Sequence, residues 1–343
     1  MITIYDIAKK AGVSPSAVSK ALNGRHDVND MTRSHIIAAA AELGYTPNVY
    51  ARGLKMKKSW LIGVVYSDGG VSLPLDHPLF LPLLDSFKQK IESDGYELLF
   101  FSDNSPLVGD NMIAHCCSRQ VDGVLLVNVD KVDATAVSAA AQDIPMVSCN
   151  LILDGVPAVI TDNETAARQA VEYLYSLGHR RIAHVAGPLQ THVVAASERL
   201  GGYKAALQAL GLEYDSSLVI EAVSWTPEAG ASAFSRLLDS KDSSFTAVFF
   251  ASDSLMMGAL PVIENHNILV PKDLSLIGFD GAQWTQFLGG GYTTFRQQAG
   301  LLGTTAAQLL LEKMEGSSQT DIVRIPAELI LRNSCAQIDD GNE

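Results

Sequence analysis

The sequence predicts a small all-α helix-turn-helix module of three helices, joined by a hinge helix to an α/β body of two lobes with doubly wound parallel sheets. The first observation is charge: residues 1–60 carry a net charge of +5, whereas the rest of the 343-residue chain carries −18. The second is patterning, because the rest alternates short apolar runs with helical patterns, as parallel sheets covered on both faces do. A basic module on an acidic body indicates that the first part meets a polyanion.

The first two predicted helices have clear start and stop signals. Thr3 can cap a helix whose apolar residues recur at helical spacing as far as Ala11, and Gly12 ends it. Ser14 is a good N-cap for the second helix, and Pro15 occupies the first helical position, where proline is favoured. Two short helices joined by a glycine turn form the outline of a helix-turn-helix.

The third predicted helix leads into a basic segment. Asn29 or Asp30 can cap this helix, and Gly44 closes it before Pro47. The segment that follows, NVYARGLKMKKSW at residues 48–60, has helix formers and four basic residues but no wide apolar stripe. We therefore expect a hinge helix that folds only when it has a partner.

The apolar runs of the body predict where a ligand binds. They begin at residues 61, 96, 123, 144, 181, 247 and 274, which is too many strands for one small sheet. Two lobes with a cleft between them are expected, and ligands of such folds bind at the carboxyl ends of the strands. The notable side chains that follow these runs are Asn150, Arg199, Trp225, Ser252, Asp253 and Asp280.

This set of side chains favours a sugar over a purine or a phosphorylated partner. Carboxylates and an arginine can hold vicinal hydroxyls through paired bonds, while aromatic rings cover the apolar face of a sugar ring. Each residue also has a structural interpretation. Asp280 could cap a helix, Arg199 could form an ion pair with Glu198 or Asp253, and Trp225 could belong to the core.

Several functional classes are not indicated by the sequence. The four cysteines do not form a disulfide framework, and the HCC run at 115–117 lacks the spacing of a zinc site. No nucleophile elbow or phosphate loop accompanies His179 and His184, which we interpret as structural. No enzyme activity, metal or cofactor is therefore expected. The absence of a long apolar run and of an export signal predicts a cytoplasmic protein.

Two long motifs, TIYDIAKKAGVSPSAVSKALNGRHDV and ELGYTPNVYARGLKMKKSWLIGVV, resemble the lactose and galactose repressor (LacI/GalR) family of bacterial transcriptional regulators. The likeness continues to about residue 332. It implies a helix-turn-helix DNA-binding domain at 1–47, a hinge helix at 48–60, and an effector-binding and dimerisation domain at 61–335. That domain is expected to resemble a type I periplasmic binding protein, with a short tail at 336–343.

The resemblance also implies how the chain divides between the lobes. The first lobe is expected at 61–161 and 292–321, and the second at 162–291 and 322–335, with crossings near residues 161, 291 and 322. The sequence runs only a few residues beyond LILRNSCAQ, so a leucine heptad tail and a tetramer are not expected.

In this family the second helix reads the major groove of DNA. The resemblance places Pro15, Ser16 and Lys20 at base edges, where lysine can donate to guanine and proline offers only apolar contact. Leu54 aligns with the leucine that wedges into the minor groove at the centre of a palindrome, beside Lys55. The alternative is a solvated helix face and a leucine packed on the body. The other residues expected at the DNA are Thr3, Ser14, Ser19, Asn23, Asn29, Thr32, Tyr45 and Asn48.

The family resemblance points to the same cleft residues. Arg199 in ERLGGY and Asp280 in GFD match the arginine and aspartate that bind the effector, and the ASD motif supplies Ser252 and Asp253. Departures from the family are a long loop at 68–79 and glycines in place of the usual proline pair before the threonines. The remaining effector candidates are Phe80, Asn150, Trp225 and Trp284.

The expected function is that of a homodimeric regulator, a repressor of carbohydrate-utilisation genes that binds a palindromic operator and responds to a mono- or disaccharide. The expected partners are double-stranded operator DNA, the small-molecule effector and a second copy of the chain, with no membrane. A nucleobase-controlled or partner-controlled regulator is the alternative. A sugar-binding protein without DNA function and a sugar enzyme are less favoured, because the basic module argues against the first and no nucleophile is paired with a base.

Overall fold

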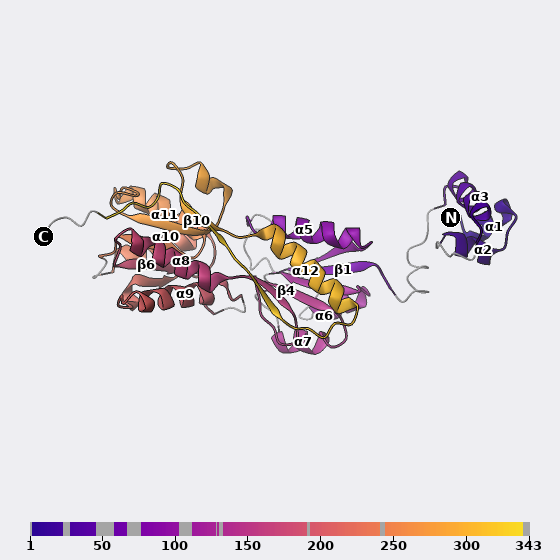
Figure 1. Ribbon diagram of the computed structural model, residues 1–343, viewed down its shortest axis with the longest axis horizontal. Helices are drawn as coiled ribbons and strands as arrows, with labels where there is room; N and C mark the ends of the chain where they lie inside the picture. Colours follow the sequence, from indigo (N-terminus) through magenta and orange to yellow (C-terminus); the bar gives the residue numbers. More distant parts are fainter. Residues whose placement is uncertain are drawn as a thin grey trace. The chain divides into compact units, whose positions relative to one another are not determined.

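The computed structural model describes residues 2–22, 28–45, 58–66, 77–102, 112–127, 129, 133–190, 193–240 and 244–338. The chain divides into two units, Met1–Ser59 and Trp60–Glu343 (Figure 1). Among the described residues, no helix is long and apolar enough to span a membrane. Several predicted sites lie outside the described residues, namely Asn23, Asn48, Leu54, Lys55 and most of the loop at 68–79.

The first unit contains the three predicted helices. They are α1 (Ile4–Ala11), α2 (Pro15–Leu22) and α3 (Asp30–Glu42). The Thr3 hydroxyl donates to Asp6 Oδ2 at 2.7 Å, and the Thr3 N–H donates to the same oxygen at 2.8 Å. Gly12 ends α1 with a φ of 65°, a conformation that favours glycine. Ile7, Val18 and Ile36, one from each helix, are fully buried and form the centre of a small core.

The predicted caps of the next two helices are also present. Ser14 Oγ accepts a hydrogen bond from the N–H of Ala17 at 3.1 Å, and Asn29 Oδ1 accepts one from the N–H of Thr32 at 2.7 Å. Each cap satisfies a backbone donor that has no partner within its helix.

The first lobe of the larger unit has a parallel six-stranded sheet in the order β11-β5-β4-β3-β1-β2. Its strands are β1 (Leu61–Tyr66), β2 (Glu97–Ser102), β3 (Gly123–Val127), β4 (Met146–Cys149), β5 (Ala158–Thr161) and β11 (Ile322–Ile325). Strand residues alternate between two cores. Val64 and Leu125 face α5 (Phe80–Ser93) and α12 (Ala299–Met314). Val65 and Val124 face α6 (Met112–Ser118) and α7 (Ala134–Ala140).

The second lobe has a six-stranded sheet in the order β12-β10-β9-β8-β6-β7, in which only the β10–β12 pairing is antiparallel. Its strands are β6 (Ile182–Ala186), β7 (Val219–Glu221), β8 (Ala247–Phe250), β9 (Ser275–Asp280), β10 (Thr293–Arg296) and β12 (Glu328–Ile330). The α-helices are α8 (Asn163–Ser176) and α9 (Ala195–Ala209) on one face, and α10 (Pro227–Leu238) and α11 (Asp253–Asn265) on the other. Two short 3-10 helices, η2 (Ser216–Leu218) and η3 (Gln283–Gln286), follow α9 and β9.

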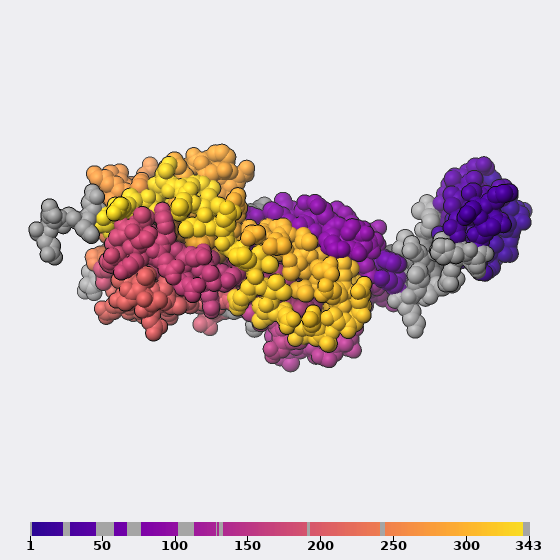
Figure 2. Space-filling model, viewed as in Figure 1, coloured from indigo at the N-terminus to yellow at the C-terminus, as the bar shows by residue number. Residues whose placement is uncertain are grey.

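Segments far apart in the sequence are packed tightly together. Figure 2 shows α12, late in the chain, on the surface of the first lobe beside α5. A Cβ atom on Gly303 of α12 would lie 2.1 Å from the carbonyl oxygen of Leu83, so this close approach requires glycine.

The lobes divide the chain differently from the prediction at two of the three crossings. Strand β10 pairs with β9, so residues 293–296 belong to the second lobe rather than to the first. Strand β11 pairs with β5, so residues 322–325 belong to the first lobe rather than to the second. The crossings predicted at 291 and 322 therefore lie after Arg296 and after Ile325. The physical reason is that both strands continue a sheet by pairing with distant strands.

Candidate functional site

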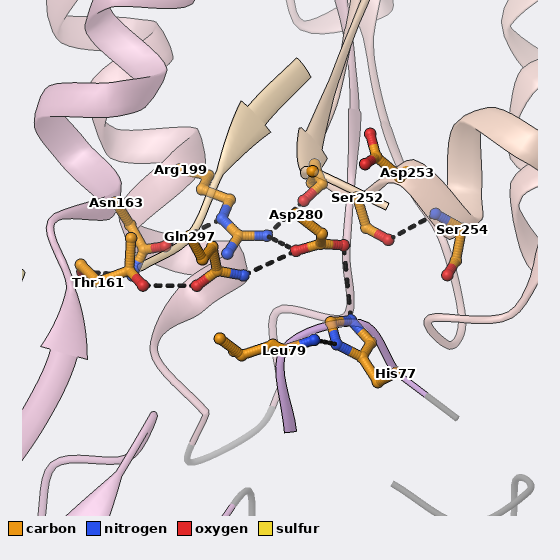
Figure 3. A network of polar contacts seen from close by, with 12 residues as sticks. His77, Leu79, Thr161, Asn163, Arg199, Ser252, Asp253, Ser254, Asp280 and Gln297 are labelled. Atoms are coloured by element: carbon orange, nitrogen blue, oxygen red, sulfur yellow. Dashed lines mark hydrogen bonds and ion pairs between the residues drawn. The ribbon is translucent and has the colours of Figure 1, made fainter. Parts of the chain in front are cut away.

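A buried network of polar side chains lies at the carboxyl ends of β5 and β9, where the two lobes meet (Figure 3). The second lobe contributes Arg199 from α9, Asn163 from the start of α8 and Asp280 from the end of β9. The first lobe contributes residues around the end of β5 and the segment before α5. This position agrees with the expectation that the ligand site lies at the carboxyl ends of parallel strands.

Arg199 is held in place by contacts on several sides. The residue is 3% exposed, its Nε donates to Asn163 Oδ1 at 3.0 Å, and its Nη1 donates to the carbonyl oxygen of Ala251. The guanidinium carbon lies 3.5 Å from the ring centroid of Phe279. Burial lowers the pKa of Arg199 to about 10, with Asp280 among the carboxylates that oppose this shift, so the group stays charged at neutral pH.

Within the described part of the chain, one carboxylate oxygen of Asp280 has no hydrogen-bond partner. Its Oδ1 accepts from Gln297 Nε2 at 2.8 Å and lies 3.8 Å from Arg199 Nη1, whereas Oδ2 is buried and accepts no hydrogen bond from the described residues. Burial opposes ionisation, but His77, Arg199 and Gln297 together hold the pKa of Asp280 below its ordinary value. Its φ of 121° costs about 1–3 kcal/mol, as strained residues at binding sites do.

Asp253 supports Asp280 from behind rather than offering a free carboxylate. Its Oδ2 accepts from the N–H of Ala282 at 2.7 Å, and its Oδ1 accepts from the hydroxyl of Thr294 at 2.8 Å. Burial and the charge of Asp280 raise the pKa of Asp253 well above its ordinary value. A Cβ on Gly278 would lie 2.0 Å from Asp253 Oδ1, so any larger residue at position 278 would force this hydrogen-bonded carboxylate to shift.

Ser252 also has a local role in the structure. Its hydroxyl oxygen accepts from the N–H of Ser254 at 3.0 Å and caps α11. The ASD motif thus begins α11 and braces the turn that follows Asp280, and both side chains are engaged in intramolecular hydrogen bonds.

Four members of the network were not singled out from the sequence, namely His77, Thr161, Asn163 and Gln297 (Figure 3). Gln297 links the lobes, because its Oε1 accepts from the hydroxyl of Thr161 and its Nε2 donates to Asp280. Asn163 Nδ2 donates to Glu198 Oε2 at 3.0 Å. A usable signal existed: Thr161, Asn163 and Gln297 are polar and lie where the chain crosses between the lobes.

Three other effector candidates border this region. Phe80 is buried, and its ring centroid lies 5.0 Å from that of His77. Asn150 has a φ of 65°, and its carbonyl oxygen accepts from the N–H of Val194 in the second lobe at 3.3 Å. The ring of Trp225 is centred 5.9 Å from the Arg199 guanidinium.

Trp284 has a different position. Its ring packs on Tyr292, with the centroids 5.7 Å apart, and both rings are partly buried against the core of the second lobe. These contacts place Trp284 against the core of the second lobe. Trp225, for which a core position was the structural alternative, also packs against this core.

The two histidines in LGHRRIAHV have structural contacts. His184 is fully buried, its ring stacks between Tyr203 and Phe249, and its Nδ1 interacts with the carbonyl oxygen of Phe249 at 2.9 Å. Burial lowers the pKa of His184 to about 4. His179 lies within hydrogen-bond distance of two hydroxyl groups, those of Thr246 and Ser275. Within the described residues, no group of three or more potential ligands could hold a metal ion.

The first unit presents a polar face on α2. Ser16 and Lys20 are exposed and four residues apart, so they lie on one side of the helix. Pro15 and Ser19 are half-buried. Thr3, Ser14 and Asn29 are helix caps, and Thr32 is the residue that Asn29 caps, so these predicted DNA contacts also hold the helix ends. Tyr45 packs against the core of this unit.

Comparison with known proteins identifies both parts of the chain. Residues 3–48 match the family model described as bacterial regulatory proteins, lacI family, and residues 171–335 match the periplasmic binding protein-like domain. The regulator CelR of Thermobifida fusca is 32% identical over 97% of this chain and 98% of its own length. The chain belongs to the LacI family. The repressor CytR of Escherichia coli is 33% identical over 97% of this LacI-family chain and 96% of its own length.

Solved structures support the same assignment. The lac repressor dimer bound to operator has a TM-score of 0.84 and 28% identity, and the match covers 98% of this LacI-family chain and 99% of the repressor chain. A CelR complex with cellobiose has a TM-score of 0.73 and 28% identity, with 97% and 100% of the two chains covered. These likenesses confirm the predicted two-part fold. The protein is a DNA-binding transcriptional regulator, and its relatives are regulators rather than enzymes.

Proposed function

We propose that this LacI-family regulator represses carbohydrate-utilisation genes, that it binds a palindromic operator as a homodimer, and that a mono- or disaccharide controls its operator affinity. The observation that carries the sugar assignment is the buried pairing of Arg199 with Asp280. Arg199 offers charged donors, and Asp280 offers a carboxylate oxygen to which no described residue donates a hydrogen bond. A hydroxyl group can accept from the first and donate to the second.

The aromatic surroundings support the same ligand class. Phe80 of the first lobe packs on His77, which faces Asp280, and the ring of Trp225 of the second lobe lies near Arg199. Such rings cover the apolar face of a sugar. The similar regulator CelR has been solved with cellobiose. A nucleobase effector is the alternative, because the same rings would stack on a base.

Control of DNA binding follows from population shift. The site takes residues from both lobes, so a ligand that contacts both stabilises one arrangement of the lobes relative to the other. Three chain crossings connect the lobes, and β1 directly follows the segment at 48–60 that we propose as the hinge helix. The effector therefore changes operator affinity by stabilising one arrangement of the two lobes, to which the proposed hinge helix is joined.

Exposed apolar side chains support a homodimer. Leu81 of α5 and Phe100 of β2 are about half exposed and line a groove on the first lobe. Val223, Phe287 and Leu288 are exposed apolar residues of the second lobe. Apolar surfaces of this kind mark protein contacts. The similar lac repressor forms a dimer on its operator.

The test is binding to a palindromic fragment selected from a random DNA library, measured against salt concentration and against a panel of sugars and nucleobases. We expect affinity to fall steeply with salt and to change with one sugar. Equal binding by a chain lacking residues 1–58 would refute the DNA assignment. Stabilisation by a nucleobase and by no sugar would refute the sugar assignment. We also propose a cytoplasmic location, because an operator-binding regulator must have access to the DNA.

A further inference from the structure

His77 reaches the effector site from the opposite lobe. It lies three residues before α5 of the first lobe, and its Nε2 is 3.5 Å from Asp280 Oδ2 of the second lobe (Figure 3). The His77 side chain is 24% exposed, whereas that of Asp280 is 2% exposed. The imidazole also packs on Phe80, with ring centroids 5.0 Å apart. His77 therefore occupies space between the predicted stacking ring and the predicted effector carboxylate.

The other ring nitrogen of His77 shows which nitrogen carries the proton. The N–H of Leu79 points at His77 Nδ1 at 3.2 Å, so Nδ1 is the acceptor whenever the ring is neutral. In the neutral ring the proton must then lie on Nε2, the nitrogen that faces Asp280. His77 thus offers Asp280 an N–H donor without having to be charged.

Asp280 Oδ2 needs such a donor. Oδ1 already accepts from Gln297, while Oδ2 is buried without a hydrogen bond from the described residues, and the 3.5 Å separation from His77 is long for one. An unsatisfied buried carboxylate oxygen is costly, so a closer donor is favoured at this position. Two kinds of donor suit the position: the His77 N–H itself after a small approach, or a hydroxyl of a bound ligand.

We propose that His77 is an internal occupant of the effector site, which presents its Nε2–H to Asp280 Oδ2 in the ligand-free protein and must be displaced by a hydroxyl of the effector. The proposal rests on the proposed role of Asp280 in effector binding. It makes His77 a specificity-determining residue: a ligand must supply a hydrogen-bond donor at this point to replace the one that it removes. A ligand group that only accepts, such as a carboxylate, loses the His77 donor and meets the Asp280 charge.

The same contact joins the lobes when no effector is bound. A second contact across the lobes, from the N–H of Val194 to the carbonyl oxygen of Asn150 at 3.3 Å, reports on the same closure without involving His77. Loss of the His77 donor should therefore expose the Val194 amide more often. Hydrogen exchange at this amide measures the contact in the absence of any ligand.

The test compares His77→Leu with His77→Gln in the full-length, ligand-free protein. Leucine keeps apolar bulk against Phe80 but removes the donor, whereas the glutamine amide places a donor near the position of Nε2. We expect Val194 exchange to be about tenfold faster in His77→Leu and within about twofold of wild type in His77→Gln. His266→Leu, at the exposed C-terminus of α11, is the matched control and should match wild type.

Two exchange results would overturn the proposal. An unchanged rate in His77→Leu means that His77 does not hold Asp280. Equal acceleration in both His77 variants means that ring packing, not the donor, makes the contact. Because this readout uses no DNA or sugar, it stands even if the proposed function fails in the operator test.

A second measurement addresses displacement. Cellobiose, ribose and adenine are titrated into wild type and His77→Leu, with tryptophan fluorescence as the signal. A sugar that binds wild type should bind His77→Leu about threefold to tenfold more tightly, because no internal donor competes. Weaker binding by the variant would make His77 a direct effector ligand and would overturn its role as a competitor.

Discussion

Glu198 Oε1 accepts a hydrogen bond from Arg324 Nη2 at 2.8 Å, and this ion pair joins α9 of the second lobe to β11 of the first. The other oxygen of Glu198 accepts from Asn163 Nδ2 at 3.0 Å, and Asn163 Oδ1 accepts from Arg199 Nε at 3.0 Å. A continuous series of hydrogen bonds between charged and amide groups therefore runs from Arg324 of one lobe to Arg199 of the other.

From this series of hydrogen bonds we expect Arg324→Met to lower effector affinity more than it lowers the stability of the fold. The Arg324 side chain is 39% exposed, so its ion pair contributes at most about 1 kcal/mol to stability. Without Arg324, Glu198 and Asn163 hold Arg199 less firmly, and we expect effector affinity to fall about threefold to tenfold. Ligand titration and chemical denaturation measure the two effects.

The matched control is Arg296→Met. Its ion pair with Glu328, also 2.8 Å long, lies within the second lobe between β10 and β12. We expect a similar small loss of stability and no change in effector affinity. Equal effects of both variants on affinity would contradict a role for the Arg324 pair between the lobes.

Asp280 and Asp253 should respond differently to substitution. Asp280→Asn keeps an acceptor for Gln297 but removes the charge beside Arg199, so we expect at least about thirtyfold weaker sugar binding with operator binding retained. Asp253→Ala leaves the Ala282 N–H and the Thr294 hydroxyl without their acceptor, and we expect a loss of about 2 kcal/mol in unfolding free energy. Thermal-shift screening measures the loss of sugar binding in Asp280→Asn, and denaturant titration measures the loss of stability in Asp253→Ala. Asp253→Ala with normal stability but no sugar binding would contradict a bracing role for Asp253.

Because His184 is buried, we expect the protein to lose stability in mild acid. Its pKa is about 4 in the folded protein and about 6.5 when unfolded, so the unfolded chain binds the extra proton between these values. Stability is fully present above pH 6.5 and falls as the pH drops toward 4, by an amount on the order of 3 kcal/mol. Denaturation of wild type and of His184→Phe between pH 4.5 and 7.5 tests this. The variant should have a flatter profile, and identical slopes would argue against His184 as the cause.

We expect different lysines to determine the sequence preference for DNA and the overall affinity for DNA. Lys20 is exposed on α2, and Lys20→Ala should relax the preference for one guanine in each half-site by about 1–3 kcal/mol. Lys55, in the proposed hinge, should act on phosphates, so Lys55→Ala should weaken binding to all sequences alike and lower the salt slope by about one. Binding to operator variants over a salt series measures both. The opposite pattern would contradict the division.

Features that depend on neighbouring residues were accessible from the sequence. Thr3, Ser14 and Asn29 cap their helices as predicted, because a cap involves only residues within the next turn. The alternation of apolar runs and helices predicted the two sheets, since burial on both faces requires continuous apolar strands. Arg199 and Asp280 were identified from short motifs, and the structure brings them to one buried pair.

Features that depend on contact between distant segments were decided by the tertiary structure. Thr161 and Gln297 are 136 residues apart and meet only because two crossings lie side by side. Two lobe boundaries differ from the predicted ones because β10 pairs with β9 and β11 pairs with β5. Strand pairing is set by the partner strand and not by the local sequence pattern.

The roles of individual site residues also could not be predicted from the sequence alone. Asp253 has the same side chain as Asp280 and a motif of its own, yet its two oxygens are occupied by Ala282 and Thr294. His77 faces Asp280 because the lobes meet there. By itself the sequence identified the charged pair of the site, Arg199 and Asp280, because each lies in a short local motif. Which carboxylate oxygen is left for a ligand depends on hydrogen bonds between distant segments, and only the folded arrangement of the two lobes decides that.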